Sequence, residues 1–155
     1  MRKSLAFALP LILCFFVMWL AGRLQTVGLT DWYPTLQKSP LTPPNVVFPI
    51  VWSVLYLCIA ITAGLLLLTP ERGGRLLMRL WSIQLVVNFC WSIFFFWFEN
   101  PLAGLADIIL LDALVLLFIL KAWRFHRVAA LLMLPYLLWI LFATYLNAYI
   151  FFANP

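Results

Sequence analysis

Amide and hydroxyl side chains recur at helical spacing inside an apolar run in the middle of the sequence. Gln84, Asn88 and Ser92 are four residues apart, so they share one face of a helix. Trp91 lies on the adjacent side of that helix. Inside a membrane such side chains either join neighbouring helices, with bonds that average about 0.6 kcal/mol, or line a binding pocket. The spacing is compatible with both interpretations.

A second stripe with the same spacing lies near the C-terminus, at Trp139, Ala143 and Asn147. The small side chain of Ala143 leaves room beside the Trp139 indole, as a bound ligand would require. Close packing of two helices would use a small residue in the same way.

Two carboxylates, Asp107 and Asp112, lie inside another apolar run. A charge at the bilayer centre costs about 2.5–3.5 kcal/mol on insertion scales, so an intramembrane Asp is a candidate functional residue. The two residues are five apart and therefore point about 140° apart around a helix. Asp107 is expected near the helix end, where it either contributes to a ligand site or bonds the adjacent turn. Asp112 is expected deeper in the membrane.

A proline-rich aromatic segment runs from a polar loop into an apolar helix. Trp32, Tyr33, Trp52 and Tyr56 provide large rings with polar tips. Several prolines, Pro44 among them, stiffen the backbone and remove amide donors. Composition alone favours an interfacial loop whose rings sit at the lipid headgroups. The alternative is a lid over a pocket.

Residues for acid–base, nucleophilic or metal chemistry are missing from the apolar runs. The single histidine, His126, lies in a basic stretch and is expected to be a solvated loop residue. The three cysteines show no metal-ligand spacing, and a haem ligated by an intramembrane histidine is not expected. We therefore expect no metal and no required cofactor. A metal-free planar ring, held by stacking and apolar contact, remains compatible with the sequence.

The composition is that of an integral membrane protein. Of 155 residues, 66% are hydrophobic and 10% charged, whereas a soluble domain is about half apolar and a quarter charged. The basic residues behind the net charge of +5 sit between apolar runs. They therefore indicate membrane topology and not a nucleic-acid partner. The first run lacks a clean signal-peptide cleavage site, so we expect a retained helix.

Five apolar runs are long enough to cross a bilayer, which takes about 20 residues. A spanning segment must satisfy its own backbone, so the runs are expected to be helices in contact with membrane lipid. The sequence predicts an all-α membrane protein, with one domain built as a five-transmembrane-helix bundle. The predicted helices cover residues 4–23, 46–68, 79–98, 102–121 and 128–152, and residues 24–45 form the lid loop. Ala60 and Gly64 are a small-xxx-small pair, compatible with a close helix contact or a dimer.

Lysine and arginine predict the orientation. One side carries Arg2, Lys3, Arg72, Arg75, Arg79, Lys121, Arg124 and Arg127. The other side carries Arg23 and Lys38. Because basic residues favour the cytoplasm, we expect a cytoplasmic N-terminus and an outward-facing lid loop, in a bacterial inner membrane.

Several groups of residues match one family signature. They are Trp32-Tyr33 with Lys38 and Pro43-Pro44, Phe48-Pro49 with Trp52 and Leu55-Tyr56, Asn88 with Trp91-Ser92 and Phe95, Ala106-Asp107, and Pro135-Tyr136, Trp139, Phe142-Ala143-Thr144 and Leu146-Asn147. On these residues, which span nearly the whole chain, the sequence resembles the translocator protein family (TspO/MBR, also called peripheral-type benzodiazepine receptor or tryptophan-rich sensory protein).

The resemblance implies a five-helix bundle, often a homodimer, with a pocket closed by the first loop. Family members bind porphyrins, and some bind sterols or benzodiazepine-type ligands. Transport of tetrapyrroles or sterols is a long-standing family role. Some bacterial members are reported to degrade protoporphyrin in light, using the tryptophans that match Trp52 and Trp139. By motif position the resemblance implies a pocket lined by Tyr33, Trp52, Asn88, Trp139, Ala143 and Asn147.

The sequence departs from the family pattern in two places. The family's sterol motif ends in a basic residue, but Leu146 and Tyr149 are followed by none, so sterol binding is not favoured. In addition, Ser39 separates Lys38 from Pro40 where the family has Lys-Pro directly. The register within the lid loop is therefore not fixed by the motif.

Three functions stay open. The first is a membrane receptor or sensor that binds porphyrins, with transport as an extension, in a pocket enclosed by the second, third and fifth helices. The second is an enzyme that degrades porphyrin with light and oxygen, with Trp52 and Trp139 as catalytic rings. The third is a proton-coupled carrier using Asp107 and Asp112, against which the lack of an inverted repeat argues. The combined ligand-site prediction is Trp32, Tyr33, Pro44, Trp52, Tyr56, Gln84, Asn88, Trp91, Asp107, Trp139, Ala143 and Asn147.

Overall fold

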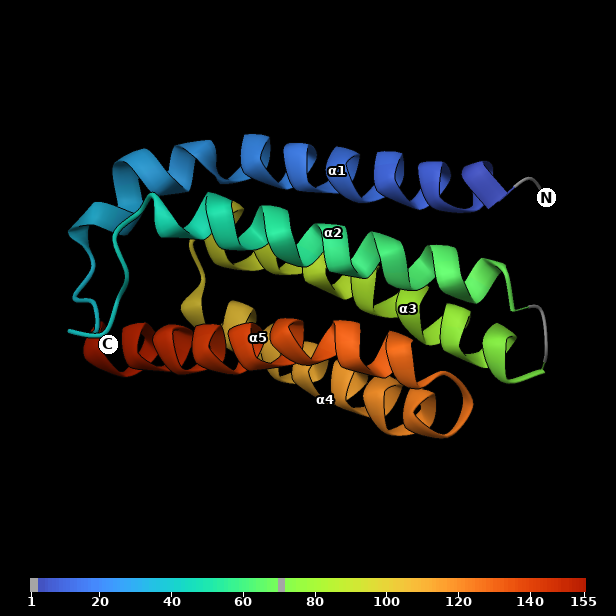
Figure 1. The fold of residues 1–155 in the computed structure, drawn as a ribbon. Helices are drawn as coiled ribbons and strands as arrows, with labels where there is room; N and C mark the ends of the chain where they lie inside the picture. Colours follow the sequence, from blue (N-terminus) through green and yellow to red (C-terminus); the bar gives the residue numbers. More distant parts are fainter. Residues whose placement is uncertain (1–2, 70–71) are drawn as a thin grey trace.

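Five helices long and apolar enough to cross a membrane make up most of the molecule (Figure 1). The computed structural model describes residues 3–69 and 72–155. The helices are α1 (Lys3–Val27), α2 (Val47–Leu67), α3 (Arg72–Ser92), α4 (Pro101–Phe125) and α5 (Arg127–Ala153). The predicted all-α class and five-helix bundle are confirmed.

The first helix is longer than predicted, and the first loop is shorter. α1 continues to Val27 and is extended by a π-helical turn, Gly28–Trp32, and a 3-10 turn, Tyr33–Thr35. The predicted loop 24–45 is therefore helical over its first half and irregular only over residues 36–46. Polarity marks where a segment leaves the hydrocarbon, but a helix can continue into the interface beyond that point.

α3 shows the same effect at its beginning. It begins at Arg72, ahead of the predicted residue 79, because the basic stretch that includes Arg75 forms the first helical turns. α2, α4 and α5 lie close to their predicted bounds, although α4 runs to Phe125, past the predicted residue 121. Arg2 and Pro70 lie outside the described residues.

Two side chains fix the beginnings of the last two helices. The Asn100 side chain accepts a hydrogen bond from the Ala103 amide at 3.0 Å, and Pro101 occupies the first turn of α4. The Nδ1 atom of His126 accepts from the Ala129 amide at 3.3 Å. His126, expected as a solvated loop residue, is thus the half-buried cap of α5.

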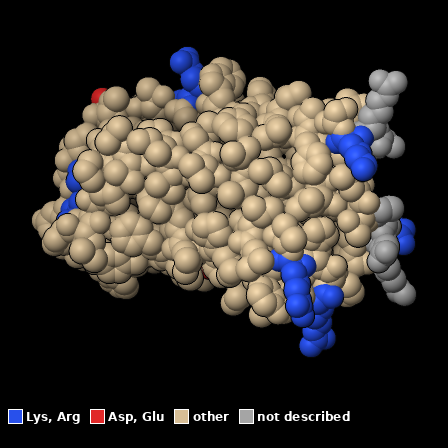
Figure 2. Space-filling view, viewed as in Figure 1, with Lys and Arg blue, Asp and Glu red and all other residues tan. Residues whose placement is uncertain are grey.

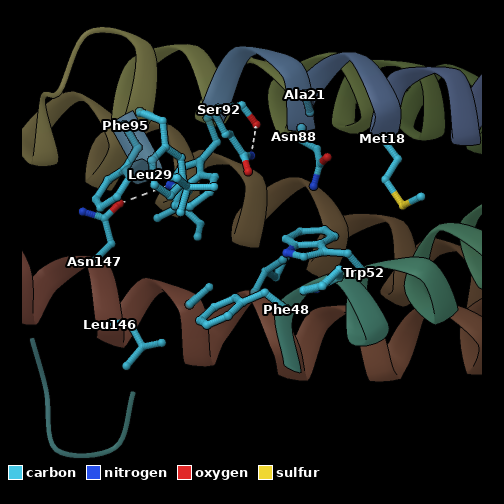
Figure 3. Close-up of a pocket in the computed structure, with 18 of the residues that line it drawn as sticks. Met18, Ala21, Leu29, Phe48, Trp52, Asn88, Ser92, Phe95, Leu146 and Asn147 are labelled. Atoms are coloured by element: carbon cyan, nitrogen blue, oxygen red, sulfur yellow. Dashed lines mark hydrogen bonds between the residues drawn. The ribbon is translucent and has the colours of Figure 1, made fainter. Parts of the chain in front are cut away.

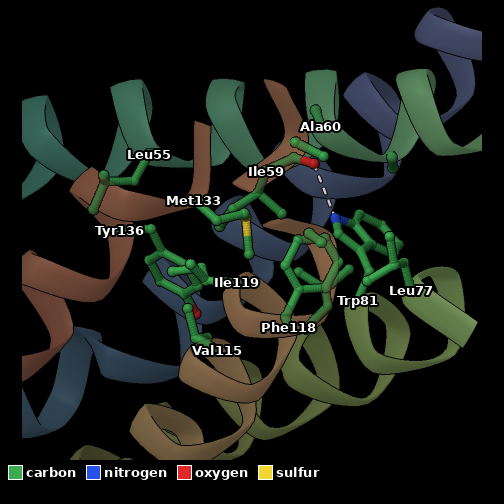
Figure 4. Packing of buried hydrophobic residues seen from close by; sticks show 14 of the residues in the cluster. Leu55, Ile59, Ala60, Leu77, Trp81, Val115, Phe118, Ile119, Met133 and Tyr136 are labelled. Atoms are coloured by element: carbon green, nitrogen blue, oxygen red, sulfur yellow. Dashed lines mark hydrogen bonds between the residues drawn. The ribbon is translucent and has the colours of Figure 1, made fainter. Parts of the chain in front are cut away.

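Buried side chains fill the space between the helices at one end of the bundle, which we call the solid end. α2 packs against α1, α3 and α5, and α4 packs against α3 and α5. Around the α2–α3 and α4–α5 connections, fully buried side chains such as Phe118, Met133 and Tyr136 fill the space between these helices (Figure 4). The buried Trp81 indole donates to the Ile59 carbonyl at 2.9 Å and ties α3 to α2.

The small pair on α2 serves a helix contact within the chain. Ala60 is fully buried, and Gly64 lies so close to the Phe7 ring of α1 that a Cβ at Gly64 would collide with it. The close helix contact that this pair predicted is confirmed.

Basic side chains gather at the solid end. Figure 2 shows most of the Lys and Arg atoms at the end of the bundle that carries the α2–α3 connection, and fewer at the opposite end. The described basic residues of the solid end include Arg75, Arg79, Lys121, Arg124 and Arg127.

Candidate functional site

The end of the bundle opposite the packed core holds a cavity of about 650 Å³ (Figure 3). Met18 and Ala21 of α1 form one side, Trp52 of α2 another, and Leu146 and Asn147 of α5 a third. Its volume lies within the range of about 300–1,000 Å³ that is typical of small-molecule sites. The residues that line it are aromatic, aliphatic or neutral polar, and the described lining includes no charged side chain.

Most of the predicted ligand residues line this cavity. Those that do so are Tyr33, Trp52, Tyr56, Asn88, Trp91, Trp139, Ala143 and Asn147. Asn88 and Ser92 of the α3 stripe therefore face the same space as the α5 stripe.

Four of the predicted residues lie outside the lining. Trp32 packs its ring edge against Phe95, 5.3 Å between centroids, and so backs the wall instead of facing the cavity. Pro44 lies in the irregular segment 36–46. Gln84 is fully buried one turn further toward the solid end than Asn88, and Asp107 is buried on α4. Gln84 and Asn88 lie on the same face of α3, but this face lines the cavity at Asn88 and packs in the core at Gln84.

Asn88 holds two phenols at the inner end of the cavity. Its Oδ1 accepts from the Tyr56 hydroxyl at 2.6 Å, and its Nδ2 donates to the Tyr136 hydroxyl at 2.9 Å. The three buried side chains come from α2, α3 and α5. One amide thus satisfies two hydroxyls and fixes three helices relative to one another.

Asn147 of α5 likewise joins helices through its side-chain amide, nearer the mouth, by bonding residues of α3 and α4. Its Oδ1 accepts from the Trp91 indole at 3.1 Å, and its Nδ2 donates to the Pro101 carbonyl at 2.8 Å (Figure 3). Gly104 makes room for this arrangement, because a Cβ there would lie 3.0 Å from the Asn147 Oδ1 and 2.9 Å from Phe95.

α1 forms a wall that the predicted enclosure by the second, third and fifth helices leaves out. Gln25 of α1 donates to the Ser92 hydroxyl of α3 at 2.7 Å, and both residues line the cavity. α4 adds Ile108 and Leu111. A weak signal was present in the sequence, since Gln25 follows the small residues Ala21 and Gly22 at helical spacing.

Two π-helical turns meet beside the cavity. Gly28–Trp32 extends α1, and Ile93–Trp97 extends α3. Gly28 lies against the Phe96 backbone so closely that a Cβ would collide with the Phe96 carbonyl. Such turns are often found at functional sites, and here the turn Ile93–Trp97 carries Phe95 and Phe96 into the cavity wall.

Aromatic rings provide flat walls. Trp91 and Phe95 stack at 5.0 Å with an interplanar angle of 12°. On the opposite side Trp52 contacts the Tyr56 ring at 5.7 Å. Trp139 meets Phe48 edge-on at 5.8 Å. A flat apolar ligand would match these surfaces by stacking and edge contacts.

The irregular segment 36–46, which we call the lid loop from here on, is fastened to the end of α5. The Gln37 amide donates to the Asn154 side chain at 2.9 Å, and the Asn154 amide donates to the Gln37 carbonyl at 3.1 Å. The Ser39 hydroxyl bonds the Tyr145 hydroxyl at 2.9 Å. Ser39, the residue that departs from the family pattern, is thus a buried attachment point.

The intramembrane carboxylates lie apart from the cavity lining. Asp112 accepts from the Thr144 hydroxyl at 2.7 Å and so joins α4 to α5. The Asp107 Oδ2 is buried without a partner among the described residues. No three His, Cys, Asp or Glu side chains group as a metal site in the described part of the chain.

Comparison with known proteins decides the family. The family model described as "TspO/MBR family" matches residues 10–153. The chain belongs to the TspO/MBR family. It is 43% identical to Tryptophan-rich protein TspO of Archaeoglobus fulgidus over 86% of this chain and 88% of that protein. It is 38% identical to Tryptophan-rich protein TspO of Chlorobaculum tepidum over 99% of both chains.

The chain is also similar to Translocator protein of Bos taurus, with 33% identity over 75% of this chain and 70% of that protein. The resemblance inferred from the sequence is confirmed. Together with the five apolar helices, the family membership makes this an integral, multi-pass membrane protein.

Proposed function

We propose that the protein is a membrane receptor or sensor that binds porphyrins and similar flat apolar ligands in the cavity enclosed by the five helices. Transport would be an extension of that role. The observation that carries the proposal is the character of the cavity: about 650 Å³, flat aromatic walls and an uncharged lining. A tetrapyrrole is a large, flat, mostly apolar ring, which these walls would contact on both faces.

The Trp139 indole adds a polar contact to this proposal. Trp139 lines the cavity, and its N–H is buried without a partner in the described structure. A buried donor left unpaired costs about 1–3 kcal/mol. A ligand that offers an acceptor to this N–H removes that cost, which favours occupied over empty protein.

The direct test is a titration of the purified protein with protoporphyrin IX, followed by quenching of tryptophan fluorescence. We expect saturation at one porphyrin per chain. Cholesterol, tested as a competitor, should displace little porphyrin because the sterol motif is incomplete. Non-saturable quenching, equal to that of an unrelated membrane protein in the same detergent, would count against the proposal.

Light-dependent porphyrin degradation is a second candidate. Trp52 and Trp139 line the same cavity, and Trp52 lies 6.3 Å from the Tyr136 ring, centroid to centroid. An excited porphyrin would take an electron from an indole and pass it to dioxygen as superoxide. The oxidised indole would lose its N–H proton and add to the porphyrin ring, and the ring radical so formed would combine with the superoxide and the released proton to give a hydroperoxide of the ring. Proton-coupled transport gains no such support, because Asp107 and Asp112 lie outside the cavity lining.

The basic residues at the solid end support a proposed orientation, with that end in the cytoplasm of a bacterial inner membrane. The cavity mouth and the lid loop then face outward. Labelling of single cysteines with a membrane-impermeant reagent tests this: a cysteine in place of Gln37 should react in intact cells, and one in place of Arg124 should react only after permeabilisation. The homodimer that the resemblance implies is a proposal to be checked by cross-linking in membranes.

A further inference from the structure

Lys38 is the cation that the lid loop places beside the cavity. Its ammonium donates to the Tyr33 carbonyl at 3.0 Å and lies 4.7 Å from the centre of the Tyr33 ring. Tyr33 lines the cavity. Both of these partners are neutral, so neither balances the charge of the ammonium.

The cavity itself has no place for a charged group of a ligand. Its described lining carries no Lys, Arg or His side chain. An ionised carboxylate taken into an uncharged, apolar site loses its hydration without gaining a partner, which is strongly unfavourable. A ligand with a flat apolar body and an anionic edge would therefore bury the body and leave the edge at the mouth.

We propose that Lys38 binds a carboxylate of the ligand at the mouth, so that the cavity selects flat apolar rings that carry carboxylates along one edge. This inference rests on the proposed function and adds to it the chemical class of the ligand and the residue that recognises it. An ammonium has three donors. The Tyr33 carbonyl takes one, which leaves two for a carboxylate.

The backbone around Lys38 is held on both sides. Gln37 is paired with Asn154, and Ser39 is bonded to Tyr145. Lys38 is also half-buried, which reduces screening of its charge by salt. A cation held in place before the ligand arrives loses little freedom on binding, so more of the attraction appears as affinity.

A purely structural role for Lys38 is the competing explanation, because its bond to the Tyr33 carbonyl also clips the lid loop to the 3-10 turn. The two roles differ in their dependence on ligand charge. A structural clip affects every ligand alike, whereas a carboxylate partner affects only ligands that carry the carboxylate.

The experiment therefore compares protoporphyrin IX, a dicarboxylate, with its uncharged dimethyl ester. Both are titrated into the wild-type protein and the variants Lys38→Met, Lys38→Arg and Arg23→Met. Arg23→Met is the matched control, because it removes an exposed positive charge from the same end of the bundle at a residue outside the cavity lining.

We expect Lys38→Met to weaken binding of the diacid about five- to tenfold, between the effect of an exposed ion pair and that of a buried charged hydrogen bond. The ester should bind the variant and the wild type equally. Lys38→Arg should keep most of the diacid affinity, and Arg23→Met should change neither. Added salt should weaken the diacid alone.

Equal losses for diacid and ester, or no loss for either, would overturn the role of Lys38 and leave porphyrin binding intact. Failure of the wild type to bind either compound would instead overturn the proposed function, and this inference with it.

Discussion

The side-chain amide of Asn88 donates to the Tyr136 hydroxyl across 2.9 Å, at the level where the packed core gives way to the cavity. Toward the solid end from this bond, side chains fill the space between the helices. Toward the other end, the helices enclose the cavity. Because the same Asn88 also accepts from Tyr56, one residue closes the base of the site.

Removal of Asn88 should therefore destabilise the bundle. Asn88→Leu leaves the Tyr56 and Tyr136 hydroxyls buried without their partner, at an expected cost of about 1–3 kcal/mol. Tyr56→Phe removes only one bond and should cost less. Thermal unfolding in detergent, followed by circular dichroism, measures both. A midpoint for Asn88→Leu at or above that of the wild type would contradict the prediction.

Trp52 should matter for porphyrin affinity more than tryptophans on the outer surface. Trp52→Ala removes a cavity wall and should weaken binding about tenfold. Trp19→Ala and Trp123→Ala are matched controls, since those side chains are 57% and 47% exposed on the outside of the bundle. Fluorescence titration gives the three dissociation constants. Equal losses from all three substitutions would exclude the cavity as the binding site.

The lid loop should control how fast a ligand leaves. Replacing residues 35–42 with a Gly/Ser linker removes Pro40, which limits the entropy lost on closure, as well as the Ser39 attachment. We expect faster release in stopped-flow fluorescence with the bundle still folded. The finer variant Tyr145→Phe with Asn154→Ala keeps the loop sequence and removes its attachments. Release rates equal to wild type in both variants would argue that the loop is an interfacial anchor and not a lid.

Gly28 and Gly22 form a matched pair for testing the contact between the π-helical turns. A Cβ at Gly28 would collide with the Phe96 carbonyl, whereas a Cβ at Gly22 meets nothing within 4 Å. Gly28→Ala should lower stability by about 1–3 kcal/mol. Gly22→Ala, in an open helical position, should be neutral or stabilise by up to about 1 kcal/mol. The same unfolding assay compares them, and similar midpoints would show that the two turns separate at little cost.

Photochemistry in the cavity should depend on the indoles. Trp52→Phe with Trp139→Phe keeps apolar rings but removes the groups that oxidise easily. If degradation is directed by the protein, the double variant should bind porphyrin yet lose the specific product under light and oxygen. Chromatography of the pigments at matched occupancy and light dose checks this. Formation of the same product at the wild-type rate would leave passive photobleaching as the explanation.

Hydropathy predicted the helices, and the family resemblance implied most of the cavity lining; the spacing of the polar residues by itself left a pocket and a helix contact both open. In a membrane, polar side chains at regular spacing are rare enough that Asn88 and Asn147 indicate an interior face directly. Gln84 shows the limit of this argument, since it has the same spacing as Asn88 but lies in the core. Spacing shows which residues share a face of a helix. Whether that face meets a cavity or packed side chains depends on the neighbouring helices, and spacing does not show this.

α1 shows a second limit. Its contribution rests on Gln25 and on residues with no polar signal, such as Met18 and Ala21. Uniformly apolar helices give no indication of which face meets the bundle and which meets lipid. The extension of α1 through Thr35 was missed for a related reason, because helical geometry continues where hydropathy already falls.

The solid end of the bundle has a consequence for traffic through the molecule. Phe118, Met133 and Tyr136 fill the base, so the cavity is closed at that end and does not run through the bundle. A molecule bound in the cavity can leave only through the mouth. Passage through the base would require α2, α3, α4 and α5 to separate and expose those side chains. Vectorial movement across the bilayer would thus require a second shape of the bundle, while capture and retention of a ligand require only the shape seen here.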